Sequence, residues 1–121
     1  MRVLIVEDDA LIGLMLEDEL EAAGWGTVVA CTAQAALREA AAGPFDLALV
    51  DLGLPGMDGV ELVRRLRAMA PGMPVVVCTG YPTGDAMMRR LPGDVAVLPK
   101  PCLASDLLRA VGAAVPRNRD P

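Results

Sequence analysis

Short apolar runs alternate with amphipathic helical patterns along the chain. The runs are VLIV, LALV, VVVC and VAVL, and the continuous apolarity of VLIV, LALV and VVV is typical of strands buried on both faces of a sheet. The pattern predicts strands at 2–6, 26–30, 46–50, 74–78 and 95–98, and helices at 10–23, 33–42, 59–70, 85–91 and 104–115. Because such short βαβ connections require parallel strands, we expect an α/β fold, a five-stranded parallel doubly wound sheet flanked by helices.

Glycine and proline residues interrupt the chain where this scheme needs turns. Gly24 follows the first helix, Gly43-Pro44 the second and Pro71-Gly72 the third. The fourth helix is confined between Pro82 and Pro92, so we expect it to be short or mobile.

Two helices carry apolar residues at helical spacing. We expect these stripes to face the core rather than a cofactor. They comprise Leu11, Met15, Leu16 and Leu20 in the first helix, and Leu62, Val63, Leu66 and Met69 in the third.

Composition narrows the class of protein. A chain of 121 residues suits a single domain, here 1–115, and the polar segment 116–121 is expected to fray. The net charge of -5 disfavours contact with nucleic acid or an anionic membrane, so the partner is expected to be a protein. The three cysteines lack CxxC spacing and the start lacks a signal-peptide core, which favours a reduced, cytoplasmic setting.

Acidic, hydroxyl and basic residues follow the apolar runs. Glu7-Asp8, Asp51, Thr79 and Lys100 each stand where a predicted strand ends. Since the carboxyl ends of parallel strands share one edge of a sheet, these side chains are expected to meet there. A carboxylate cluster in a chain without histidine suits Mg²⁺ and phosphate oxygens, which points to phosphoryl chemistry.

At these residues the chain resembles, over essentially its whole length, the receiver domain of two-component response regulators, which is CheY-like with flavodoxin-like strand order 2-1-3-4-5. The resemblance implies that Asp51 accepts a phosphoryl group, that Asp8 binds Mg²⁺ directly and that Glu7 reaches the ion through water. It also implies that Gly53 offers its backbone carbonyl to the metal. Asp9 is expected to cap the first helix.

The remaining motif residues also have counterparts in the family. Thr79 corresponds to the hydroxyl that bonds a phosphoryl oxygen, Lys100 to the lysine that pairs with that group, and Pro101 to the proline after a cis peptide. The implied reaction is in-line attack by Asp51 on a phosphohistidine, with Mg²⁺ and Lys100 offsetting charge on the oxygens. The donor would be a histidine kinase or phosphotransfer protein, and the output a downstream protein. Such a receiver assists its own phosphotransfer and dephosphorylation without being an enzyme.

Two positions depart from the usual pattern. Val97 stands where many receivers carry an aromatic switch residue, and Tyr81 lies just past Thr79. The segment CTGY is similar in part to the Phe-Ala-Thr-Gly-x-Tyr signature of a subgroup linked to HWE-class histidine kinases. A switch through Thr79 and Tyr81 would then alter residues 80–94 on phosphorylation.

Other interpretations stay open. Taken alone, Asp51 suits a turn or helix cap, Thr79 an ordinary strand end, Lys100 a surface lysine, and Tyr81 packing on the sheet. A pseudo-receiver would keep the fold and bind partners without phosphorylation. A small-molecule phosphohydrolase is disfavoured, because the chain has no DxD motif around Asp51 and no cap domain.

Overall fold

In the computed structural model, residues 2–54, 56, 58–80, 89–99 and 104–114 are described. They contain a five-stranded sheet in the order β2-β1-β3-β4-β5, in which all neighbouring strands are parallel. The strands are β1 (Arg2–Val6), β2 (Gly26–Ala30), β3 (Leu47–Asp51), β4 (Val75–Thr79) and β5 (Ala96–Pro99). The predicted fold class and strand order are therefore confirmed.

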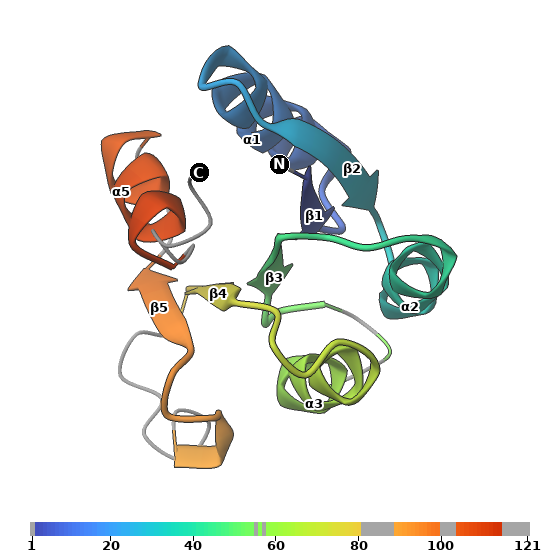
Figure 1. Cartoon of the computed structure of the whole chain (residues 1–121). Helices are drawn as coiled ribbons and strands as arrows, with labels where there is room; N and C mark the ends of the chain where they lie inside the picture. Colours follow the sequence, from blue (N-terminus) through green and yellow to red (C-terminus); the bar gives the residue numbers. More distant parts are fainter. Residues whose placement is uncertain (1, 55, 57, 81–88, 100–103, 115–121) are drawn as a thin grey trace.

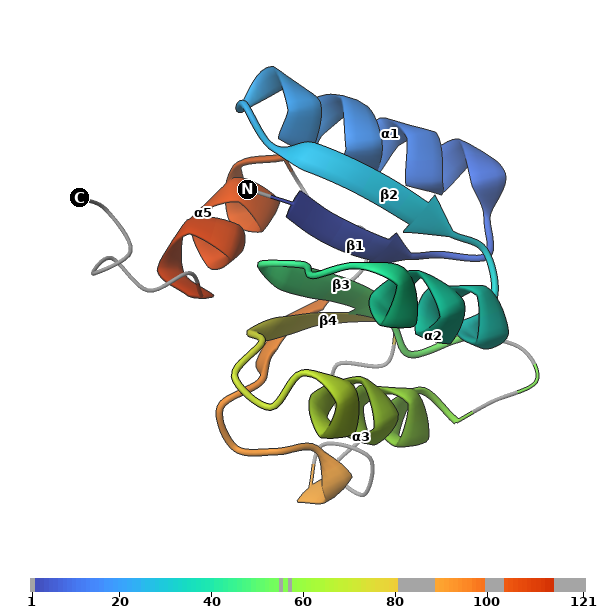
Figure 2. The ribbon, with the colours of Figure 1, turned by 45° about the vertical axis from the view of Figure 1, so that its right-hand side comes forward.

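Helices cover both faces of the sheet (Figure 1). They are α1 (Ala10–Ala22), α2 (Ala33–Ala42), α3 (Gly59–Met69) and α5 (Ala104–Ala114). Helices α1 and α5 lie on one face, and α2 and α3 lie side by side on the other, as Figure 2 also shows. Of the predicted fourth helix, only 89–91 lie within the described residues, and 89–90 are helical.

The sheet separates two hydrophobic clusters, one under each pair of helices. Alternate residues of β1 divide between them, with Leu4 and Val6 on the α2–α3 side and Val3 and Ile5 on the other. All four are essentially inaccessible to solvent. The apolar runs in β1, β3 and β4 are thus buried on both faces, as the sequence predicted, whereas the run in the edge strand β5 is only partly buried.

The predicted core stripe of α1 is only partly correct. Leu16 and Leu20 are buried, but Leu11 is 67% exposed and Met15 is 55% exposed. The third buried position of α1 is Gly13, where an added Cβ would lie 3.1 Å from Cγ1 of Val29 in β2. The helix is therefore rotated so that its glycine faces the sheet, and large apolar side chains of its first two turns point outward.

The predicted stripe of α3 is correct except at its end. Leu62, Val63 and Leu66 are fully buried, whereas Met69 is 45% exposed. Met69 is the last helical residue, and the chain leaves the helix there toward β4. None of the helices in the described part of the chain is long and apolar enough to cross a membrane.

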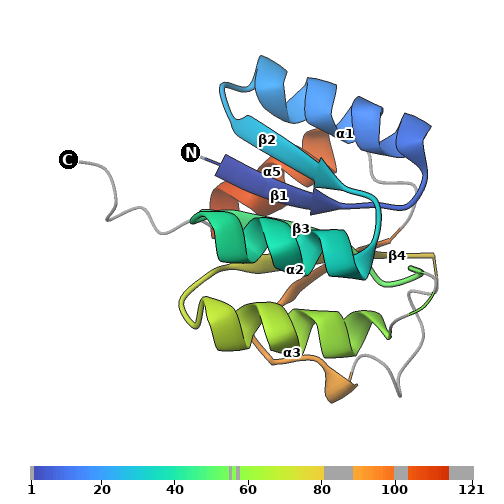
Figure 3. The same ribbon diagram turned by 90° about the vertical axis from the view of Figure 1, so that its right-hand side faces the viewer.

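The chain enters each helix from one edge of the sheet. In Figure 3 the arrowheads of β1 and β2 point to the same edge, where the chain turns into α1 and α2. Side chains placed directly after the strands therefore gather there.

Candidate functional site

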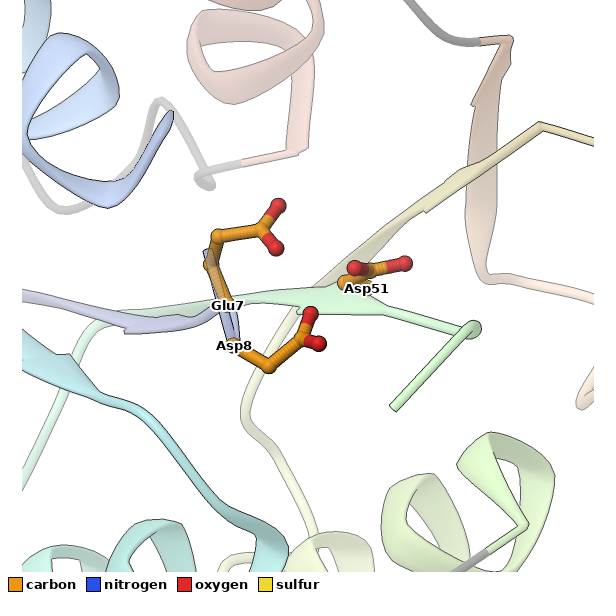
Figure 4. Close-up of side chains that lie close together, drawn as sticks. All are labelled: Glu7, Asp8 and Asp51. Carbon is orange, nitrogen blue, oxygen red and sulfur yellow. The ribbon is translucent and has the colours of Figure 1, made fainter. Parts of the chain in front are cut away.

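Three carboxylates gather at the carboxyl edge of the sheet. Glu7 and Asp8 follow β1 directly, and Asp51 is the last residue of the neighbouring β3. One carboxylate oxygen from each lies within 4.8 Å of the other two. Figure 4 shows the three side chains close together at this edge. The register explains the meeting, because Val6 pairs with Val50 and the next residue of each strand is acidic. The sequence prediction that these acids lie together is confirmed.

The cluster combines burial with like charge. Glu7 is 4% exposed and Asp51 5% exposed, whereas Asp8 is open to solvent. Ionised carboxylates this close repel one another, and burial weakens the screening by water. A small cation approaching from the side of Asp8 would relieve that repulsion, and three carboxylate oxygens are the ligands that Mg²⁺ prefers. The donor set therefore fits a magnesium ion.

The backbone around Asp51 holds its carboxylate in place. The N–H of Gly53 donates a 2.8 Å hydrogen bond to Oδ1 of Asp51. The N–H of Leu52 donates to the carbonyl of Cys78, which continues the pairing of β3 with β4 past Asp51. Asp51 thus forms a local turn, but it does not cap α3, whose N-cap is Asp58.

The first acidic segment divides its roles among three residues. Asp9 is the N-cap of α1, and its Oδ1 accepts hydrogen bonds from the N–H groups of Leu11 at 3.0 Å and Ile12 at 3.2 Å. Oε2 of Glu7 accepts a 3.1 Å bond from the N–H of Asp9. The predicted cap is confirmed, and the cap leaves Glu7 and Asp8 as the acids that face Asp51.

Thr79 ends the next strand along the sheet. It is buried, and it stands one residue beyond Cys78, the β4 partner of Asp51. On its other side it pairs with Pro99 of β5. Thr79 is therefore at the same edge as the acids. Val97 pairs with Val77 in the sheet.

Three predicted site residues lie outside the described residues: Tyr81, Lys100 and Pro101. The predicted switch at Tyr81, the lysine contact and the cis peptide before Pro101 are therefore untested. Residues 116–121, predicted to fray, also lie outside the described part.

The start of α3 carries a feature that the sequence prediction missed. Oδ1 of Asp58 accepts a 2.9 Å bond from the N–H of Val60, and Oδ2 lies 2.6 Å from Nη2 of Arg90. The Val60 hydrogen bond, followed by Arg90, lowers the pKa of the Asp58 carboxyl below its ordinary value. An Asp-Gly pair before an amphipathic pattern is a sequence signal for such a cap. Nothing in the sequence pointed to Arg90.

Comparison with known proteins identifies the class. Residues 3–112 match the family described as "Response regulator receiver domain". The chain is 36% identical over 120 residues to the DNA-binding response regulator MtrA of Mycobacterium tuberculosis, covering 98% of this chain and 52% of MtrA. The chain thus belongs to the response regulator receiver domain family of two-component systems. It spans about half the length of this relative.

Solved structures share the fold. A CheY-like response regulator receiver domain from Methanospirillum hungatei matches with a TM-score of 0.82 and 31% identity, covering 93% of this chain and 90% of that one. The response regulator TrrA of Thermotoga maritima, solved in complex with Mg²⁺ and BeF, matches with a TM-score of 0.79 and 23% identity, covering 94% and 98%. The second likeness supports the fold alone.

Proposed function

We propose that this chain is a phosphoacceptor receiver in which Asp51 takes a phosphoryl group from a phosphohistidine. The observation that carries the proposal is the buried Asp51, held by the Gly53 N–H and within 4.8 Å of two further carboxylates. Membership of the receiver family supports the same role. The functional unit is residues 1–115, within which the family match falls.

Mg²⁺ is the metal that the donor set suits best. Asp8, Asp51, Glu7 (through water) and the backbone carbonyl of Gly53 are the groups that would hold it. When bound, the ion offsets negative charge on phosphoryl oxygens. We assign Lys100 and Thr79 to the same task.

The transfer itself is a displacement at phosphorus. A carboxylate oxygen of Asp51 forms a bond to phosphorus as the bond to the donor imidazole nitrogen breaks, and the imidazole takes up a proton. Gly53 is exposed and has no side chain to cover the product, so water can approach the acyl phosphate. We therefore expect rapid self-dephosphorylation.

The partners in this proposal are proteins. The donor is a histidine kinase or a phosphotransfer protein, and the CTGY likeness favours a kinase of the HWE class. MtrA is named as DNA-binding, but this chain spans only about half of it, and the net charge of -5 disfavours direct contact with nucleic acid. We propose a cytoplasmic protein that signals through contacts altered by Thr79, Tyr81 and residues 80–94.

The test is the mass of the intact protein after incubation with Mg²⁺ and acetyl phosphate. We expect a single phosphoryl adduct that is lost in Asp51→Asn and without Mg²⁺, but retained in Asp18→Asn, a control at an exposed aspartate of α1. A folded wild type with no adduct, even with the beryllofluoride mimic, would favour the pseudo-receiver.

A further inference from the structure

The first residue of α3, Gly59, packs closely against Leu52, at the start of the connection from Asp51 to α3. A Cβ added to Gly59 would lie 2.7 Å from Cδ2, 2.8 Å from Cα and 3.0 Å from the carbonyl oxygen of Leu52. The first residue of α3 therefore rests against the residue that follows Asp51. Real Cβ atoms almost never approach other atoms so closely, so only glycine permits this contact.

The residue before Gly59 is tied to a distant part of the chain. Asp58 caps α3 with one carboxylate oxygen and contacts the Arg90 guanidinium with the other, at 2.6 Å. Arg90 lies in the connection between β4 and β5, which starts directly after Thr79 and ends before Ala96. Both side chains are partly exposed, 46% for Arg90 and 36% for Asp58. The pair thus bridges two loops that both adjoin the strand ends of the site.

We propose that Arg90 is a positioning residue for the phosphoacceptor site. The ion pair with Asp58 restrains the start of α3. The contact between Gly59 and Leu52 then restrains the backbone between Asp51 and Gly53. This inference rests on the proposed function. It adds a route from the site to the β4–β5 connection that does not require Tyr81 or an aromatic residue at Val97.

The route has physical reasons to transmit small displacements. Backbone atoms in contact without free space between them move together, because a shift of Gly59 toward Leu52 would produce overlap. The cap restrains Asp58 further, since its carboxylate is anchored to the helix and to Arg90 at once. Coupling is reciprocal, so a group bound at Asp51 must change the strength of the Asp58–Arg90 pair by the same factor.

The size of the effect is bounded by the exposure of the pair. Exposed ion pairs change an equilibrium by a factor of about two to five. We expect loss of the pair to weaken Mg²⁺-dependent beryllofluoride binding by roughly that factor. Beryllofluoride is the suitable probe because it stands in for the phosphoryl group and does not hydrolyse away.

The variants are chosen to spare the helix. Asp58→Asn removes the charge but keeps a side chain that caps helices equally well. Arg90→Met removes the guanidinium, and Arg89→Met is the matched control at the adjacent exposed arginine. The double variant Asp58→Asn with Arg90→Met completes a cycle that isolates the pair.

Two readouts are needed. Calorimetry gives the dissociation constant of beryllofluoride in saturating Mg²⁺, and amide hydrogen exchange of the ligand-free protein reports on the Gly53 N–H that bonds Asp51. We expect both single variants and the double variant to bind about two- to fivefold more weakly and to exchange the Gly53 amide faster, with Arg89→Met unchanged. The melting temperatures of the two single variants and the double variant should fall by similar small amounts.

The outcomes of these experiments decide whether Arg90 positions the site. Equal affinities and unchanged Gly53 exchange in Arg90→Met and Asp58→Asn would overturn the positioning role, as would an equal effect of Arg89→Met. Additive losses in the double variant would show that the two residues act separately. If the wild type binds no beryllofluoride, the proposed function fails, while the exchange of Gly53 still decides whether Arg90 controls the loop.

Discussion

The N–H of Gly53 donates a 2.8 Å hydrogen bond to Oδ1 of Asp51, the residue two places before it. One carboxylate oxygen is thereby oriented by the backbone of the same turn. The bonding residue is itself exposed and carries no side chain, so the turn orients the carboxylate without covering it.

The first prediction concerns the lifetime of the acyl phosphate. Replacing Gly53 by arginine should slow self-dephosphorylation several-fold, because a long side chain beside Asp51 obstructs the attacking water. The substitution keeps the backbone N–H at position 53 that bonds Asp51. The measurement is the decay of the phosphoryl adduct by intact mass, with Gly72→Arg, at a distant exposed glycine, as the control. A lifetime no longer than that of the wild type would contradict the prediction.

The second prediction concerns repulsion among the three acids. Asp8→Asn should raise the free energy of unfolding by roughly 1 kcal/mol without metal, because it removes one of three neighbouring negative charges. It should also abolish most of the stabilisation that Mg²⁺ gives the wild type. Denaturant unfolding with and without Mg²⁺ checks both effects, and Asp18→Asn should show neither. An unchanged Mg²⁺ response in Asp8→Asn would count against the metal site.

The third prediction concerns acid stability. A hydrogen bond from Arg67 lowers the pKa of the Asp94 carboxyl, and the Val60 N–H and Arg90 do the same for Asp58. A carboxyl with a lowered folded pKa contributes stability that is complete above its unfolded value near 3.8 and is lost as the pH falls through the folded value.

Asp94→Asn should therefore destabilise the protein at neutral pH and leave it nearly unaffected at the acid end of the titration. Denaturant unfolding across the acidic range, compared with wild type, tests this. A constant difference at all pH values would show that the ion pair between Arg67 and Asp94, at 3.0 Å, contributes nothing through charge.

The fourth prediction separates the two sides of α1. Met15→Gln should change the free energy of unfolding by less than about 0.5 kcal/mol, because Met15 is mostly exposed. Leu20→Ala should cost about 2–5 kcal/mol, since Leu20 is fully buried and its removal leaves a cavity. Similar losses for both substitutions would mean that the orientation of α1 is different from the one described.

The sequence predicted a parallel sheet because short crossovers join its apolar runs, and the strand order came from the resemblance to receiver domains. Three strands were placed one residue early, at 46–50, 74–78 and 95–98. Their pairing continues through Asp51, Thr79 and Pro99, residues that the apolar pattern treats as outside the strand. The acid cluster followed from the same topology, since residues directly after adjacent parallel strands must meet.

Other features could not be read from the pattern. The first two turns of α1 are apolar on nearly every side, so periodicity could not orient the helix, and Gly13 carries no side chain to mark the inner face. The Asp58–Arg90 pair joins residues far apart in sequence, and a single charge has no periodicity. Thr79 was predicted to follow its strand and stands at the carboxyl edge of the sheet, whereas Tyr81 and Lys100 lie outside the described part of the chain.

The contact between Gly59 and Leu52 also limits how the connection between them can change. A loop whose first and last residues are in contact tolerates substitutions, but an insertion or deletion must disturb the Gly59–Leu52 contact or bulge away from it. We expect related sequences to vary in the composition of this segment and to keep its length.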